Sequence, residues 1–216
     1  MTVPRALLFG SIGTIVETSE LQRQAYNLAF VDLGVACVWD VDNYRSLLSA
    51  SGGMNRLRKV FDGRLNDNLL KKIHESKEKF YADLVKTGLQ PRPGVKGIIQ
   101  RCKRLNVKLA WVTTTSRQNI NSILNAVPDL SESDFSFVTD SSTVVEAKPH
   151  PAIYRYALDK LGVVANEALA IEDTAVSLQA PVSINIPSYL FLGDYASIEG
   201  SQPAVVVDDL ESISLG

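Results

Sequence analysis

The sequence contains few residues of the kinds that build metal centres or disulfide frameworks. In 216 residues there are two cysteines and two histidines. The cysteines, Cys37 and Cys102, are far apart in the chain, so they suggest neither a disulfide framework nor a metal-binding pair. No apolar run approaches the roughly 18 residues of a membrane-spanning helix, and the N-terminal residues do not have the pattern of a secretory leader. We therefore expect a cytoplasmic protein with reduced thiols.

An excess of charge of one sign is also missing. The chain has 22 Lys and Arg residues against 24 Asp and Glu residues, a net charge of −2, and no basic block stands out. This balance argues against an extended nucleic-acid footprint and against a polybasic membrane patch. A hydrophobic content of 45% is enough for a full core. We expect a monomer that binds neither nucleic acid nor membranes.

Short apolar runs alternate with helical patterns along most of the chain. The runs at 6–9, 107–112, 135–138, 168–171, 189–192 and 204–207 predict strands. Helical spacing separates most of them, which indicates a doubly wound parallel α/β sheet with helices on both faces. Residues 17–88 have only helical patterns. We therefore predict a core made of 1–16 plus 89–216, interrupted after its first strand by a helical insertion at 17–88.

Ligands of such sheets bind at the carboxyl ends of the strands. The stretches to inspect are therefore 10–14, 113–116, Lys148 and the pair Glu172-Asp173. Together with two further motifs they resemble the haloacid dehalogenase superfamily, in the branch of β-phosphoglucomutase and sugar-phosphate phosphatases. The further motifs are Ser51-Gly52-Gly53-Met54-Asn55-Arg56 and Arg92-Pro93-Gly94-Val95. The resemblance covers almost the whole chain and implies that 17–88 is a helical cap domain over the core.

The chain departs from the family at the first motif. In the family, the first strand ends in Asp-x-Asp; the first aspartate forms an aspartyl-phosphate and the second acts as acid and base. Here these two positions are Gly10 and Ile12, so the resemblance implies no intact catalytic pair. Ser11 is the one nearby hydroxyl. In an extended segment its side chain would point away from positions 10 and 12, and no His or Lys adjoins it as a base. We interpret it as a turn residue.

Other family positions are kept. The resemblance implies that Thr113, with Thr114 beside it, binds a phosphoryl oxygen and that Lys148 neutralises the phosphate. Ser116 is expected to cap the next helix, whose N-terminal amides favour anions. In the cap, Gln22 and Arg56 correspond to substrate-contacting positions.

The acidic pair Glu172-Asp173 matches the family's magnesium motif. Magnesium takes several oxygen ligands, and the loss of the aspartate at position 10 leaves a weak or absent site. The alternative interpretation is an acidic pair at a helix N-terminus. In the helix that follows, Pro181 would cost about 3 kcal/mol in an interior position, and Asn185 is expected to end the helix in the left-handed conformation.

We therefore predict an inactive phosphatase homologue that binds a phosphorylated metabolite or a partner protein. One alternative is a hydrolase of a small phosphate ester with weak or non-standard magnesium-dependent activity. A second is a ligand-free structural or interaction protein, favoured if apolar side chains fill the cleft.

Overall fold

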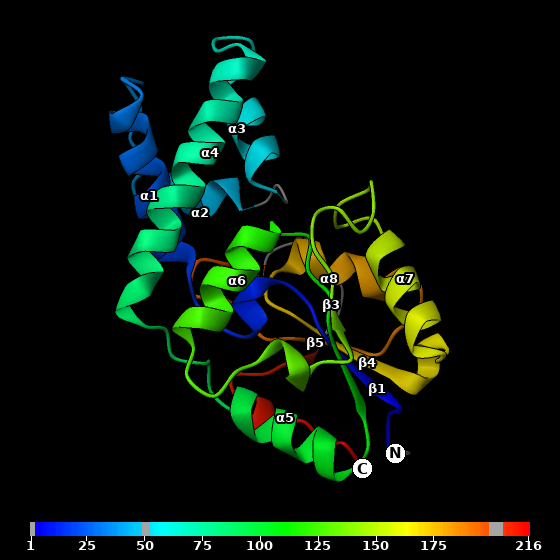
Figure 1. Ribbon diagram of the computed structural model, residues 1–216. Coiled ribbons are helices and arrows are strands. Elements are labelled where there is room, and N and C mark those ends of the chain that lie inside the picture. The colour runs from blue at the N-terminus through cyan, green and yellow to red at the C-terminus, as the bar shows by residue number, and fades with distance from the viewer. Residues whose placement is uncertain (1–2, 49–51, 199–204) are drawn as a thin grey trace.

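A six-stranded parallel sheet forms the centre of the molecule (Figure 1). The computed structural model describes residues 3–48, 52–198 and 205–216. The strands lie in the order β3-β2-β1-β4-β5-β6, and every neighbouring pair is parallel. Their bounds are Ala6–Phe9 for β1, Lys108–Trp111 for β2, Phe137–Val138 for β3, Ala168–Glu172 for β4, Ser188–Leu190 for β5 and Val205–Val206 for β6. The predicted fold class is confirmed.

Each strand overlaps its predicted apolar run: β1 matches it, β2 and β3 are shorter, β4 extends one residue further, and β5 begins one residue earlier. Ala204 lies outside the described residues. Four helices flank the sheet: α5 Val95–Arg104, α6 Arg117–Ala126, α7 Ala152–Leu161 and α8 Ala175–Val182. Short 3-10 turns complete the chain: η1 Ile12–Thr14, η2 Val85–Thr87, η3 Glu132–Asp134, η4 Ala165–Glu167 and η5 Leu210–Ser212.

Successive side chains of a strand point to opposite faces of a sheet, and this rule divides the core in two. Leu7 and Phe9 of β1 pack in the cluster that contains apolar residues of α5 and α6. Ala6 and Leu8 pack in the cluster that contains apolar residues of α7 and α8. Because helices cover both faces, the central strands are buried throughout and read as continuous apolar runs.

Four helices are inserted between β1 and α5 and gather beside the sheet (Figure 1). They are α1 Ser19–Asp32, α2 Val41–Leu47, α3 Gly53–Phe61 and α4 Asp67–Leu84. Their apolar faces form a separate core around Tyr26, Phe30 and Trp39. We call α1–α4 the inserted helices and keep the division into 17–88 and the remainder as a proposal. The predicted signature at 51–56 is described only from Gly52 onward.

Two crossing segments join the inserted helices to the sheet, and Arg92 ties them together. Val16 and Pro91 form an isolated antiparallel bridge. The Arg92 guanidinium donates to the carbonyl oxygens of Gly13 at 2.6 Å, Phe191 at 2.8 Å and Leu192 at 2.6 Å. It also lies 3.5 Å from the centroid of the Phe191 ring. Three loops therefore meet at one side chain.

No helix in the described parts of the chain has the length and apolar character needed to cross a membrane.

Candidate functional site

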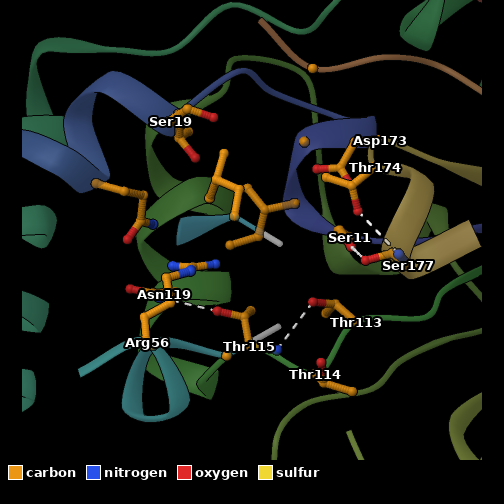
Figure 2. A pocket seen from close by; sticks show the side chains of 18 of the residues that line it. Ser11, Ser19, Arg56, Thr113, Thr114, Thr115, Asn119, Asp173, Thr174 and Ser177 are labelled. Carbon is orange, nitrogen blue, oxygen red and sulfur yellow. Dashed lines mark hydrogen bonds between the residues drawn. The ribbon is translucent and has the colours of Figure 1, made fainter. Parts of the chain in front are cut away.

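A polar pocket of about 340 Å³ lies between the carboxyl ends of the strands and the inserted helices. Ser11, Asp173, Thr174 and Ser177 stand on one side of it, and Arg56 and Asn119 face them from the opposite side (Figure 2). The sheet topology explains the position, because the loops after β1, β2 and β4 end at the same edge.

Gly10 and Ile12 flank Ser11 in the first loop, and the extended backbone ends at Ser11. After β1 the chain enters the 3-10 turn Ile12–Thr14. Thr14 donates from its backbone N–H and its side-chain hydroxyl to the carbonyl oxygen of Ser11. Ser11 and Ile12 both line the pocket. The expectation that Ser11 points away is therefore wrong, because the turn ends the strand alternation on which it rested.

Glu172 fills the space that a side chain at position 10 would occupy. A Cβ added to Gly10 would overlap the Glu172 carboxylate. Gly10 lies beside β4, with its N–H donating to the carbonyl oxygen of Ile171 at 2.8 Å. Only a residue without a side chain leaves room at position 10 for this carboxylate.

Four donors hold the Glu172 carboxylate, which is completely buried. Lys148 Nζ and Tyr154 Oη each lie 2.6 Å from Oε1. The backbone N–H and the hydroxyl of Ser11 each lie 3.1 Å from Oε2. Lys148 also donates to the carbonyl oxygen of Val112 at 2.7 Å. Glu172 and Lys148 therefore form a buried, hydrogen-bonded ion pair.

The predicted phosphate-binding lysine is accordingly placed behind the pocket. Lys148 is 3% exposed, and neither it nor Glu172 is among the described residues that line the pocket. Its charge is balanced inside the protein by Glu172. A direct contact between Lys148 and a ligand stays a prediction, and in this arrangement it would require Glu172 to move.

Asp173 is the acidic residue of the pair that faces the pocket. Its Oδ1 atom is buried without a hydrogen-bond partner among the described residues. Burial, with the negative charge of Glu172 adding to it, raises the pKa of Asp173 to about 7. Gly13 makes room for it, because a Cβ there would overlap the Asp173 carboxylate. The next residue, Thr174, caps α8 by accepting from the Ser177 N–H.

Hydroxyl groups surround the start of α6. Thr113, Thr114, Thr115 and Ser116 all line the pocket. The Thr113 hydroxyl accepts from the Thr115 N–H at 3.2 Å. Ser116 caps the helix, its hydroxyl accepting from the Asn119 N–H at 3.2 Å, so the predicted cap is confirmed. The free amides of a helix N-terminus favour an anion, and this is the most anion-friendly wall of the pocket.

The inserted helices supply the opposite wall, which includes both residues predicted there, Gln22 and Arg56. The Arg56 guanidinium donates to Tyr44 Oη at 3.4 Å and lies 5.8 Å from the centroid of that ring. Ser19, which also lines the pocket, is the first residue of α1; Thr18 is the N-cap, with no side-chain cap bond.

Sequence reasoning missed four further residues of the pocket: His74, Lys77 and Glu78 of α4, and Asn119 of α6. Lys77 and Glu78 form a buried ion pair at 2.9 Å. Glu78 also accepts from the hydroxyl of Ser116 and from Nδ2 of Asn119, which connects α4 to α6. Burial lowers the pKa of His74. The i, i+3 and i+4 spacing of 74, 77 and 78 on α4 was the signal available in the sequence.

The pocket leaves polar atoms without partners on both walls. Among the described residues, His74 Nδ1 and Asn119 Oδ1 have no hydrogen-bond partner, like Asp173 Oδ1 opposite them. Asn119 is only 4% exposed. Unpaired buried polar groups are costly, so the pocket is built for a polar occupant.

Comparison with known proteins places these features in a family. The model of the haloacid dehalogenase-like hydrolases matches residues 4–183. The protein CbbY of Cereibacter sphaeroides is 34% identical over 199 residues, which are 90% of this chain and 86% of that protein. A phosphorylated carbohydrates phosphatase of Thermotoga maritima is 26% identical over 182 residues, 84% of this chain and 82% of that protein.

Solved structures agree with the fold. CbbY from Rhodobacter sphaeroides in complex with phosphate superimposes with a TM-score of 0.88 at 32% identity, covering 95% of this chain and 94% of that one. An aspartate-to-asparagine mutant of the same protein in complex with xylulose 1,5-bisphosphate gives a TM-score of 0.89 with the same coverage. A β-phosphoglucomutase from Clostridium difficile, 23% identical, shares the fold with a TM-score of 0.80 over 99% of this chain and 94% of that one.

Proposed function

The chain belongs to the haloacid dehalogenase-like hydrolase family, and we propose that it binds a small phosphorylated sugar without aspartyl-phosphate chemistry. One observation supports the lack of aspartyl-phosphate chemistry. The space for a nucleophilic side chain at position 10 holds the Glu172 carboxylate, tied to Lys148 and Tyr154. A residue elsewhere has taken the place of the nucleophile.

The relatives support the binding of a phosphorylated sugar. CbbY, 34% identical to this chain, is described in complex with phosphate and, as an aspartate-to-asparagine mutant, with xylulose 1,5-bisphosphate. In this protein we place one phosphate against the hydroxyls and amides at the start of α6, from Thr113 to Ser116. The far end of the ligand then lies near Arg56 and Gln22. Asn119 and Asp173 both line the pocket and offer polar side chains to the sugar part of the ligand.

Magnesium, which the family implies, fits these residues poorly. Among the described residues, no three His, Cys, Asp or Glu side chains gather as a metal site. The four donors around Glu172 use both of its oxygens, so of the adjacent acidic pair Asp173 alone lines the pocket. Magnesium normally uses one or two carboxylates together with substrate phosphate and water, and we assign it no step.

Hydrolysis of a phosphate ester is the second candidate function. It is favoured by the relatives, one of which is named a phosphorylated carbohydrates phosphatase. A ligand-free interaction protein is less well supported, because a pocket of about 340 Å³ stays open beside Ile12 and many of its lining side chains carry hydroxyl, amide or charged groups. A protein partner and the monomeric state remain predictions.

Calorimetric titration with xylulose 1,5-bisphosphate, with and without magnesium, tests the proposal. We expect binding, and we expect Arg56→Gln to weaken it by about 1.5–3 kcal/mol because a charge-assisted contact is lost. The matched control is Arg58→Gln on the same helix, which removes an exposed ion pair with Asp67 and leaves the pocket lining intact.

The same samples are assayed for release of inorganic phosphate. We expect none at the ordinary enzyme range of about 1–10³ s⁻¹. Turnover in that range would establish the second candidate, and the absence of any binding would reject the proposal.

A further inference from the structure

Ser11 has the surroundings of an activated hydroxyl, which nothing in the first motif leads one to expect. Its Oγ lies 3.1 Å from Oε2 of Glu172. The hydroxyl of Ser177 is 3.4 Å away from the same Oγ atom (Figure 2). Ser11 also lines the pocket. A nucleophile and a base within about 2.6–3.2 Å, with the base oriented by a third group, is the recurring arrangement of covalent catalysis.

Two groups orient the base Glu172. Lys148 Nζ and Tyr154 Oη both donate to Oε1 of Glu172 at 2.6 Å, which leaves Oε2 turned toward Ser11. The Ser11 N–H donates to the same Oε2 atom at 3.1 Å. The carboxylate therefore cannot rotate away without breaking several bonds, and the Ser11 hydroxyl is held against it.

The pocket also offers a place for the group that such a hydroxyl would attack. The threonine hydroxyls and the N-terminus of α6, from Thr113 to Ser116, line the same cavity as Ser11. A phosphoryl group held there by hydroxyls and amides would be open to Ser11 at one side. Phosphoryl transfer depends mainly on positioning and charge stabilisation, and a carboxylate suffices to accept the proton of an attacking hydroxyl.

We propose that Ser11 Oγ accepts the phosphoryl group of a phosphate monoester bound in this pocket. A bond forms between Oγ and phosphorus, and the ester P–O bond breaks. The proton of Ser11 passes to Glu172 Oε2, and the leaving alkoxide takes a proton from solvent. The products are phosphoserine and an alcohol, and no oxidant, reductant or metal is consumed. The inference rests on the proposed function, because it uses the same phosphate wall.

The phosphoserine is expected to accumulate. Position 12, which holds the acid–base aspartate in the family, is Ile12 here, and its side chain cannot activate water. Each chain would therefore be labelled once and turn over slowly, which distinguishes this chemistry from that of an efficient phosphatase.

The experiment uses p-nitrophenyl phosphate, whose leaving group needs no proton. The full chain is incubated with it, nitrophenolate release is followed, and the protein is examined by intact-mass and peptide mass spectrometry. We expect a burst of at most one nitrophenolate per chain, with one phosphoryl group on Ser11. Ser11→Ala should abolish both, and Glu172→Gln should slow the burst by about 10²-fold or more. Ser122→Ala, a serine of α6 outside the pocket lining, should behave as wild type.

Each outcome decides something. Phosphoserine at position 11 supports the inference, and circular dichroism of Ser11→Ala checks that this variant is folded. An unlabelled wild type, a label on another residue, or an unchanged burst in Ser11→Ala would overturn it. Calorimetry with xylulose 1,5-bisphosphate on the same preparation separates the two ideas: binding without label rejects the role of Ser11 alone, and no binding rejects the proposed function.

Discussion

Gly10 directly follows β1, and Glu172 is the last residue of the neighbouring strand β4. The absence of a side chain at position 10 makes room for the carboxylate of Glu172. β1 and β4 pair in register from Ala6 with Ala168 to Phe9 with Ile171. The residues that follow therefore end side by side. A glycine at 10 leaves a space, the Glu172 carboxylate enters it, and Lys148 keeps an anionic partner. The buried lysine is thus satisfied although the first motif has no acidic side chain.

We expect the effects of substitutions at positions 10 and 172 on the free energy of unfolding to be strongly coupled. Gly10→Asp alone should destabilise by about 1–3 kcal/mol, because the new side chain overlaps Glu172. Glu172→Ala alone should cost about 3–5 kcal/mol, because Lys148 stays buried without a partner. The double variant should lose much less than the sum, since the aspartate returns a carboxylate to Lys148. A double-mutant cycle from urea unfolding measures this coupling.

The exposed ion pair of Glu167 with Arg5 provides the control. Glu167→Ala should change stability by no more than about 1 kcal/mol and should add independently to Gly10→Asp. Simple additivity of Gly10→Asp and Glu172→Ala would mean that Glu172 does not occupy the space beside position 10.

Asp173 predicts a pH dependence of stability. Its pKa is raised from 3.8 to about 7 in the folded protein by burial and by the charge of Glu172. Between these two values the folded state binds more protons than the unfolded state, so the free energy of unfolding should fall as pH rises from about 4 to about 7. Each unit of the pKa shift contributes about 1.4 kcal/mol.

Asp173→Asn should remove this contribution, while Asp159→Asn, on the exposed side of α7, should leave it. The measurement is urea unfolding at a series of pH values, with the variant curve subtracted from the wild-type curve. A wild type whose stability rises across this window relative to Asp173→Asn would contradict the assignment.

Much of the site was predictable because it depends on strand ends. Thr113, Thr114 and Asp173 follow strands, and Gln22 and Arg56 come from a recognisable insertion; all five line the pocket. The ion pair of Lys148 with Glu172 was not predictable. It depends on which of two adjacent carboxylates turns inward, and that choice is set by the space at Gly10, which only three-dimensional register reveals.

At the scale of single elements, helix ends follow their local sequence. Ser116 caps α6, and Gly88, at a φ of 96°, follows the turn that ends α4. Pro181 is tolerated because α8 ends one residue later at Val182, so the proline affects only the last turn of helical hydrogen bonds. Ser19 is the first residue of α1 and not its cap: Thr18 holds the N-cap position, and the Ser19 N–H donates to Glu17 at 2.7 Å.

Asn185 gives a test at this scale. Its φ is 60°, the left-handed conformation predicted for it. Asn185→Ala should destabilise by about 1–2 kcal/mol, because a Cβ without a compensating polar group is disfavoured there. Asn185→Gly should be neutral or slightly stabilising, since glycine adopts this conformation without steric cost. Urea unfolding of both variants measures the difference, and equal effects would remove backbone conformation as the cause.

At the scale of the whole molecule, the segments that Arg92 ties together join the core of the inserted helices to the two apolar clusters of the sheet. The fold was predictable because its long apolar and helical patterns are local. The relation between the inserted helices and the sheet was not, because it depends on contacts between distant residues, such as Glu78 with Ser116 and Arg92 with Phe191.

Arg92→Lys should therefore destabilise the protein by about 1.5–3 kcal/mol. Lysine keeps the charge, but it lacks the planar fork that reaches three carbonyl oxygens at once and stacks on Phe191. Arg155→Lys on the exposed face of α7 is the matched control and should change little. The measurement is thermal and urea unfolding; equal stability of the two variants would show that the carbonyl contacts carry no net energy.

The buried pair of Glu172 and Lys148 also limits which mutational paths are open to this sequence. A change to an acidic residue at position 10 meets an occupied space as long as Glu172 remains, so we expect that single step to lower stability. Removing Glu172 first leaves Lys148 buried without its anionic partner. Both orders pass through a weakened intermediate, so the two positions are under sign epistasis. In evolutionary terms, positions 10 and 172 can then change only together without a loss of stability.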